Sequence, residues 1–334
     1  MKLLILGGTL FLGRHVVEAA LERGHEVTLF NRGRTNAGLY PETEHLRGDR
    51  DGDLSALGGR AWDAVVDPSG YVPRVVEAST ELLGGAARHY TFVSSISVYR
   101  DFAQAGVAED YPLAELPEES EDVATHYGAL KALCEEVVSE QFAERALIVR
   151  AGVIVGPYDW TNRFGWWVRR VARGGEVLVP AAPEWPVQIV HARDLADWIL
   201  EMAQRRIGGN FNAVNEPMPM MDVLGEIRGL TGSDADFVPV DEQFLLDEGV
   251  EPWDGLPLWL ATSAHPDFAG MMAVDVSRAQ AAGLRGRPLA ETIREVLGWE
   301  EQPVHRDYGS RGGSAGLDSG RERELLTAWA NLKR

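Results

Sequence analysis

Tyr127 stands four residues before Lys131 in the segment THYGALKALCEE, residues 125–136. Most of this segment consists of good helix formers, so the two side chains should lie on one helical face, one turn apart. A free tyrosine has a pKa of about 10, and a neighbouring lysine lowers that pKa because it favours the phenolate. The pair could therefore move a proton to or from a substrate oxygen. It could equally be a solvated helix face, and these twelve residues alone do not decide between the two.

Two further motifs precede this pair. The segment SSISVY, residues 94–99, ends a β-branched and aromatic run and supplies serine hydroxyls that could face the same substrate oxygen. The segment GGTLFLG, Gly7 to Gly13, follows an apolar run and opens a helical pattern, which is the context of a dinucleotide-binding turn. Leu10 stands where the usual spacing has its middle glycine, and a ligand-free tight turn is the alternative. The order of the three motifs favours a site.

Strand and helix patterns alternate along the first half of the chain. Such alternation predicts βαβ units and a parallel sheet with helices on both faces. The predicted strands lie within residues 2–8, 25–33, 44–49, 62–70, 89–99, 145–157 and 209–215, and the predicted helices within 11–24, 72–85 and 125–136. We therefore expect an α/β fold, a Rossmann-type doubly wound parallel sheet with a smaller C-terminal substrate domain.

The pattern changes after Pro157, where tryptophans and prolines cluster. We expect a dinucleotide-binding domain over residues 1–157, to which 187–215 return, and a substrate-binding domain over 158–186 and 216–300. Residues 301–334 should form a linker and a last helix. Trp160, Trp166, Trp167 and Trp185 could wall an apolar or ring-shaped substrate, or they could pack between domains.

Composition excludes several classes of function. The 334 residues carry a formal net charge of −19, which repels phosphate backbones and argues against nucleic-acid binding. No apolar run is long enough to span a membrane, and a single cysteine suits a reducing compartment, so we expect a cytoplasmic protein with no membrane partner. The eight histidines lack the spacing of metal ligands, so we expect no metal.

The motifs GGTLFLG, FVSSISVY, YGALK, VRAGVIVGP and HARDLADWI, in this order, resemble the extended or atypical short-chain dehydrogenases/reductases of the NAD-dependent epimerase/dehydratase superfamily. The resemblance covers most of residues 1 to 300. It implies that Tyr127 is the catalytic acid/base, that Lys131 lowers its pKa and holds the nicotinamide ribose, and that Ser95 is the hydroxyl donor, with Ser94 as the neighbour easily confused with it. Asp49 would meet the adenine. The glycine motif and the end of the second predicted strand supply the other expected cofactor contacts, which are Gly7, Gly8, Thr9, Phe11, Leu12, Gly13, Asn31 and Arg32.

Departures from the family pattern limit the expected chemistry. Ile96 and Ser97 stand where sugar-nucleotide dehydratases carry acidic residues, and Val153 stands where epimerases usually carry an asparagine. We therefore expect an NAD(P)-dependent oxidoreductase that transfers hydride to or from a carbonyl or secondary alcohol. A sugar or sugar-nucleotide epimerase acting through a transient ketone remains an alternative. A non-catalytic or RNA-associated protein is the alternative from another class, because the chloroplast stem-loop-binding proteins share the GGTxFxG start.

The second predicted strand ends in TLFNRGRT, with Asn31 where NAD-specific enzymes of this fold usually carry a carboxylate. Asparagine does not repel a 2′-phosphate, and Arg32 or Arg34 could bind one. We therefore expect NADP, with NAD as the other possible cofactor. The expected partners are a small-molecule substrate and a second copy of the chain, because relatives commonly pair through the helix that carries YxxxK.

Overall fold

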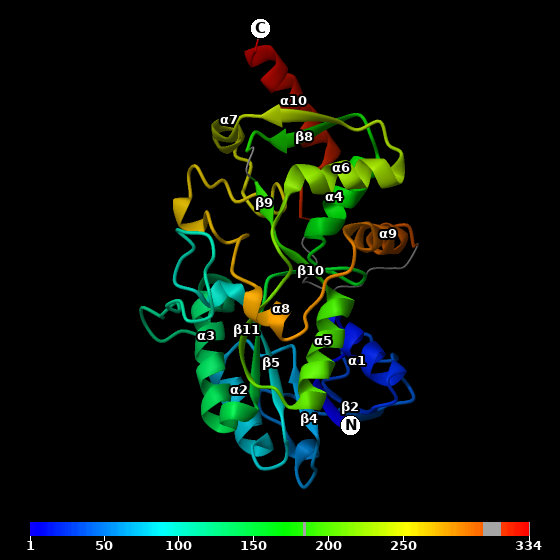
Figure 1. The fold of residues 1–334 in the computed structure, drawn as a ribbon, viewed down its shortest axis with the longest axis vertical. Coiled ribbons are helices and arrows are strands. Elements are labelled where there is room, and N and C mark those ends of the chain that lie inside the picture. Colours follow the sequence, from blue (N-terminus) through cyan, green and yellow to red (C-terminus); the bar gives the residue numbers. More distant parts are fainter. Residues whose placement is uncertain (183–184, 303–314, 334) are drawn as a thin grey trace.

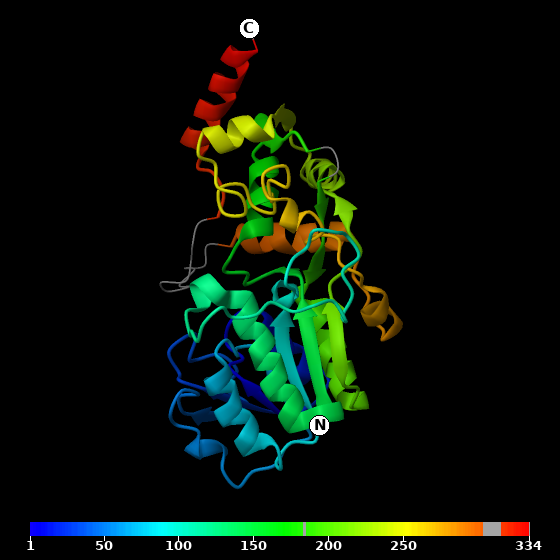
Figure 2. The ribbon, with the colours of Figure 1, turned by 90° about the vertical axis from the view of Figure 1, so that its left-hand side faces the viewer.

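Seven strands form the main sheet, in the order β11-β6-β5-β4-β1-β2-β3, and every adjacent pair is parallel. The computed structural model describes residues 1–182, 185–302 and 315–333. Strand carboxyl ends point toward the smaller C-terminal part (Figure 2). In chain order the strands of this sheet are β1 (Lys2–Leu6), β2 (Glu26–Asn31), β3 (Glu44–Arg47), β4 (Ala64–Asp67), β5 (Tyr90–Ser95), β6 (Ala146–Ala151) and β11 (Gly209–Ala213).

Helices cover both faces of this sheet, because alternate residues of each buried strand point to opposite faces. Leu3 and Ile5 of β1 pack in the cluster that contains helices α1 (Phe11–Glu22) and α5 (Ala192–Arg205). Leu4 and Leu6 pack in the cluster of the opposite face, under α2 (Pro73–Leu83) and α3 (Val123–Phe142). The expected α/β fold class is thereby confirmed.

The C-terminal part lies over the carboxyl ends of the strands and has its own core (Figure 1). Three two-stranded pairs contribute to it: β7 with β10, β8 with β13, and β9 with β12. The strands are β7 (Val153–Val155), β8 (Glu176–Pro180), β9 (Pro186–Val187), β10 (Ile189–His191), β12 (Met218–Pro219) and β13 (Asp236–Val240). The remaining helices are α4 (Arg163–Ala172), α6 (Met220–Thr231), α7 (Glu242–Asp247), α8 (Ser277–Ala281), α9 (Leu289–Glu300) and α10 (Ser319–Leu332). Of these, α8 packs in the core of the main sheet through Ala279.

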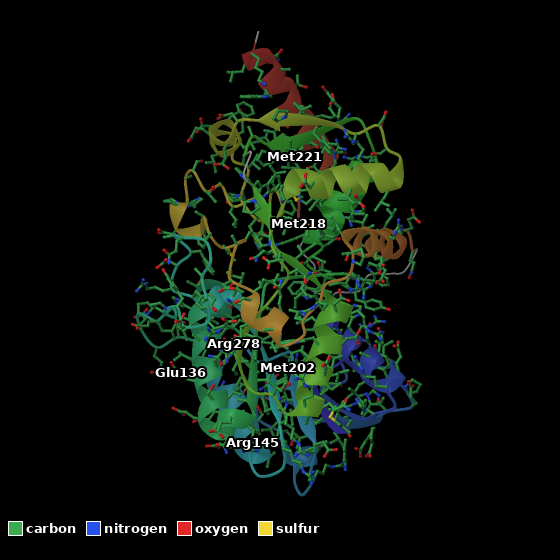
Figure 3. The ribbon with its side chains drawn as sticks, viewed as in Figure 1. Glu136, Arg145, Met202, Met218, Met221 and Arg278 are labelled. Atoms are coloured by element: carbon green, nitrogen blue, oxygen red, sulfur yellow. The ribbon has the colours of Figure 1, made fainter. Side chains whose placement is uncertain are left out.

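Helix α8 joins the two parts at the edge of the main sheet. Its Arg278, labelled in Figure 3, places its guanidinium 4.8 Å from the centre of the Phe211 ring on β11. Segment 187–215 leaves the C-terminal part through β10 and α5 and ends in β11. The domain limits that we expect from the sequence stay predictions.

Helix α10 projects from the body at the C-terminus (Figures 1 and 2) and is anchored along its length, with Trp329 donating to the Pro239 carbonyl at 3.1 Å. Leu325 is fully buried in the core of the C-terminal part, whereas Leu332 is 71% exposed. The buried carboxylate of Glu322 accepts hydrogen bonds from Arg170 Nε at 2.6 Å and from the Leu178 amide at 3.1 Å. The helix therefore docks on the body of its own chain. Much of the linker expected before it, residues 303–314, lies outside the described residues.

Candidate functional site

The GGTLFLG turn lies between β1 and α1 and depends on its glycines. Gly7 and Gly8 have φ values of +115° and +85°, which L side chains rarely adopt. A Cβ on Gly13 would stand 3.1 Å from the backbone of Gly8, so a glycine lets the first turn of α1 approach the turn after β1 closely. Helix α1 starts at Phe11 with no side-chain cap and no acidic residue in its first turn. Its free amides can therefore receive an anion such as a pyrophosphate.

Gly8 is also a packing position. A Cβ there would stand 2.7 Å from Leu29 Cδ2, in addition to the backbone strain. Gly8→Ala should lower the free energy of unfolding by more than the ~1–3 kcal/mol of an unfavourable φ alone. The control is Gly24→Ala, which has a φ of +70° and no atom within 4 Å of its Cβ. Urea denaturation of both variants measures the difference, and equal losses would show that the contact with Leu29 carries no cost.

The end of β2 is held by the side chain of Asn31. Its amide nitrogen donates to the Gly7 carbonyl at 3.0 Å, and its oxygen accepts from the Gly33 amide at 2.9 Å and from the Arg47 guanidinium. Asn31 thus fixes the turn that follows β2 against the glycine turn. Arg32 is exposed, and its nearest ion-pair partner is Asp49 at 3.9 Å. Because this ion pair is long and exposed, the Arg32 guanidinium can rotate and bind a second anion.

Ser95 ends β5 and caps the short 3₁₀ turn that follows it. Its Oγ accepts from the Ser97 amide and donates to Ser97 Oγ, both at 3.1 Å. This cap explains why the strand ends at Ser95, before the end of the predicted segment 89–99. Ser94 Oγ is buried and, among the described residues, has no hydrogen-bond partner. Both hydroxyls line the pocket described below, so the geometry leaves Ser94 as a second candidate beside Ser95.

Tyr127 reaches Ser95 because helix α3 lies very close to the end of β5. A Cβ on Gly128 would overlap the Ser97 carbonyl oxygen, so only glycine permits this approach. The backbone of α3 is non-helical at His126, which separates its first turn from the YxxxK segment. Burial raises the pKa of Tyr127 to about 12, and so does the nearby Tyr71, while a hydrogen bond with Ser95 acts in the opposite direction.

Lys131 makes contacts that the sequence did not predict. Its buried Nζ donates to the carbonyl oxygens of Gly70 at 2.7 Å and Val93 at 2.6 Å, and it lies 4.1 Å from the centre of the Phe92 ring. Burial lowers the pKa of Lys131 to about 8. Its ammonium is directed at the two carbonyls and burial dominates at the phenol, so this geometry does not itself support a lowered pKa of Tyr127, and the expected role of Lys131 at the cofactor stays a prediction. Lys131 ties the loop after β4 to β5.

One buried charged group, paired with the pocket-lining Arg50, was not predicted from the sequence. Asp67 ends β4, is fully buried, and accepts from Arg50 at 2.6 and 2.5 Å and from the Tyr90 hydroxyl at 2.9 Å. Burial opposes its ionisation, but Arg50 holds the pKa of this carboxyl below its usual range. Its oxygen also accepts from the Ser69 amide at 3.1 Å, which shapes the loop toward Tyr71. The sequence feature that could have indicated this group is a charged residue, Asp67, at the end of an apolar strand.

A pocket of about 600 Å³ follows the carboxyl ends of the strands. Its volume is within the range of small-molecule sites. Every predicted site residue lines it: Gly7, Gly8, Thr9, Phe11, Leu12, Gly13, Asn31, Arg32, Asp49, Ser95, Tyr127 and Lys131. Residues that the sequence did not single out also line it, among them Ser69, Tyr71 and Ile154. The fold thus brings the three motifs into one cavity, and the individual roles of these residues stay predictions.

The tryptophans divide between the pocket and the core. Trp160 lines the pocket. Trp167 is fully buried and donates to the Pro257 carbonyl at 2.7 Å, and Trp185 donates to the Leu258 carbonyl at 2.8 Å. Trp166 is only 8% exposed and lies with them in the hydrophobic core of the C-terminal part. Trp166, Trp167 and Trp185 therefore belong to the core of the C-terminal part. The hypothesis that they wall a substrate is wrong for these three residues.

Neither a metal cluster nor a membrane span is found in the part of the chain that the structure describes. Within residues 1–182, 185–302 and 315–333, no three His, Cys, Asp or Glu side chains group so as to hold an ion. None of the helices in these ranges is long and apolar enough to cross a bilayer.

Comparison with known proteins adds one curated relative. It is the chloroplast stem-loop binding protein of 41 kDa b, chloroplastic, from Arabidopsis thaliana, 29% identical over 256 residues. The match takes in 69% of this chain and 63% of that protein, so this chain spans less than two thirds of the relative's length.

Solved structures show the same fold. The enzyme WbmH of Bordetella bronchiseptica in complex with NAD⁺ has a TM-score of 0.65 at 18% identity, with 91% of this chain and 99% of that chain covered. The UDP-glucuronic acid 4-epimerase of Bacillus cereus in complex with NAD has a TM-score of 0.63 at 16% identity, with 92% and 99% covered. The model of the NAD dependent epimerase/dehydratase family matches residues 3–214. The chain belongs to the NAD dependent epimerase/dehydratase family.

Proposed function

We propose that this protein is an NAD(P)-dependent oxidoreductase that transfers hydride to a carbonyl group or from the corresponding secondary alcohol. The observation that carries the proposal is the meeting of Ser95, Tyr127 and Lys131 with the glycine turn in one pocket. The turn fits a dinucleotide, because its positive-φ glycines and the uncapped start of α1 leave backbone amides open to a pyrophosphate. A bound nicotinamide supplies or receives the hydride.

Tyr127 would supply the proton to the substrate oxygen. The phenol is protonated at neutral pH, so it can donate its proton to the oxygen of a carbonyl that is being reduced. The hydroxyl of Ser95, on the same side of the pocket, would donate a hydrogen bond to that oxygen. Lys131 would act by positioning, since it holds the loop after β4 and the end of β5 through two carbonyl groups. Reduction of a carbonyl compound by NADPH should therefore require the Tyr127 hydroxyl.

Two other functions have their own support. Epimerisation through a transient ketone would use the same residues, and the family includes epimerases such as the Bacillus cereus structure. An RNA-associated role is favoured by the name of the Arabidopsis relative. Against RNA stands the net charge of −19, which repels phosphate backbones. The absence of a nucleic-acid partner and the expected homodimer both stay predictions.

We also propose NADP(H) as the preferred cofactor, with Arg32 as the main contact of the 2′-phosphate. Asn31 brings no negative charge to the end of β2, and the exposed Arg32 lies 3.9 Å from Asp49. Arg32→Ala should weaken NADPH binding by at least ~1.5 kcal/mol, the lower range for hydrogen bonds to charged groups, and leave NADH binding nearly unchanged. Titration followed by nicotinamide fluorescence measures both affinities.

The control for this prediction is Arg23→Ala, which removes an arginine that pairs with Asp197 and does not line the pocket. It should leave both affinities unchanged. Tighter binding of NADH than of NADPH by the unmodified protein, or equal losses for both cofactors in Arg32→Ala, would contradict the preference.

A further inference from the structure

The loop that follows β2, residues 32–40, is tied to the glycine turn and to α1 by its side chains. The Asn36 side-chain amide donates to the Thr9 carbonyl at 2.9 Å, and the Tyr40 hydroxyl donates to the Glu18 carboxylate on α1 at 2.9 Å. Neither Asn36 nor Tyr40 lines the pocket, although other residues of the loop do. The two side chains therefore hold the turn and the helix rather than a ligand in the pocket.

The backbone of the glycine turn needs such ties. Besides the two glycines, Phe11 has a positive φ of +35°, which is unfavourable for an L residue, and strained backbone persists only where surrounding contacts impose it. Leu10, at the position where dinucleotide turns usually carry their middle glycine, has an ordinary extended conformation with φ −136° and ψ 138°. A glycine is therefore not required at Leu10, and the shape of the turn depends on what holds the peptide groups beside it.

Asn36 holds the peptide group between Thr9 and Leu10. In a trans peptide the carbonyl oxygen and the amide hydrogen point in opposite directions, so a Thr9 carbonyl turned toward Asn36 turns the Leu10 amide away from the loop. In the part of the chain that the structure describes, the amides of Leu10, Phe11 and Leu12 have no hydrogen-bond partner. All three residues line the pocket. The bond from Asn36 thus sets the orientation of the first of three consecutive free amides.

A purely structural role for Asn36 is the alternative. The side chain is exposed, so it contributes little to the hydrophobic core. Its φ of +48° lies in the left-handed region, which glycine adopts without strain. Asn36→Gly should therefore keep the fold and remove only the amide that holds the Thr9 carbonyl.

Resting on the proposed dinucleotide-dependent function, we infer that Asn36 is a positioning residue for the cofactor. By holding the Thr9 carbonyl it directs the free amides at the start of α1 toward the pyrophosphate, which these amides and the positive end of the helix dipole stabilise. It thereby raises the affinity for the dinucleotide without touching it. The Asn36 amide and the ordinary φ of Leu10 together account for a turn that functions without a middle glycine.

The test compares the unmodified full-length protein with Asn36→Gly, using two ligands. NADPH carries the pyrophosphate, whereas 2′-AMP has the adenosine and the 2′-phosphate of NADPH but no pyrophosphate. Asn36→Gly should raise the Kd of NADPH about tenfold, because hydrogen bonds to a charged group are weakened. The inhibition constant of 2′-AMP against NADPH should stay unchanged, because Arg32 and the rest of the loop are kept. Nicotinamide fluorescence measures both constants.

The matched control is Asn162→Gly. Asn162 also has a positive φ, +56°, but its side chain accepts from Arg169 at 3.0 Å and does not line the pocket. This variant should leave the Kd of NADPH unchanged. Urea denaturation of both variants checks that each keeps its fold.

The outcomes separate this inference from the function on which it rests. An unchanged Kd of NADPH in Asn36→Gly would overturn the role of Asn36 and leave the proposed function standing. Equal weakening of NADPH and 2′-AMP would also overturn it, because the loop as a whole, Arg32 included, would then have lost its shape. If the unmodified protein binds neither NADPH nor NADH, the proposed function is wrong, and the positioning role falls with it.

Discussion

Tyr127→Phe should lower turnover by about 10²–10⁴-fold, the usual contribution of a general acid or base, with little change in cofactor affinity. The substitution keeps the ring and removes only the hydroxyl that shares a hydrogen bond with Ser95. The measurement is the kcat for a carbonyl compound that the unmodified protein reduces with NADPH, together with the Kd of NADPH. Dinucleotide affinity should hold, because the glycine turn and the end of β2 are untouched.

The matched control is Tyr111→Phe, which removes a phenol that donates to Asp101 at 2.7 Å and does not line the pocket. It should keep full turnover. A Tyr127→Phe variant with unreduced kcat would show that the proton comes from another group, and the pocket hydroxyls of Ser94 and Ser95 would be next to examine.

Glu135→Ala should lower the free energy of unfolding by about 3–5 kcal/mol, because it leaves the Arg150 guanidinium buried without its counter-ion. Both side chains are almost fully buried, and the carboxylate accepts from Arg150 Nη2 at 2.7 Å and from Nε at 3.1 Å. This pair fastens α3, which carries Tyr127, to β6. Urea denaturation gives the loss directly.

The control is Glu136→Ala, the neighbouring and exposed glutamate on α3 that Figure 3 labels. It should change stability by a few tenths of a kcal/mol at most, since it removes a solvated charge. The double variant Glu135→Ala, Arg150→Met should recover part of the loss, because no unpaired charge then remains in the core. Similar losses for Glu135→Ala and Glu136→Ala would contradict the account of the buried pair.

The sheet could be predicted because its sequence signals are local. Except for β3, each strand of the first half contains a short apolar run, and β1, β4 and β7 are followed closely by glycine or proline turns. The alternation with helical patterns then implies parallel pairing. The site could be located for a related reason, because the carboxyl ends of parallel strands meet at one edge of the sheet.

Other features depend on which segments meet in three dimensions. Gly128 matters only because α3 approaches the Ser97 carbonyl, and nothing near it in sequence indicates this contact. The direction of Lys131 follows from the position of the Gly70 and Val93 carbonyls, which are 61 and 38 residues away. Three of the four clustered tryptophans are core residues, because a second hydrophobic core forms from segments as distant as Leu258.

The central claim is that the pocket binds a nicotinamide dinucleotide for hydride transfer, and one titration tests it most directly. NADPH is added to the protein and nicotinamide fluorescence is recorded, while a stem-loop RNA is titrated in parallel and followed by gel mobility. The account predicts saturable binding of one NADPH per chain and no retardation of the RNA at the same protein concentration. Retardation of the RNA with no saturable binding of NADPH or NADH would contradict it and favour the RNA-associated alternative.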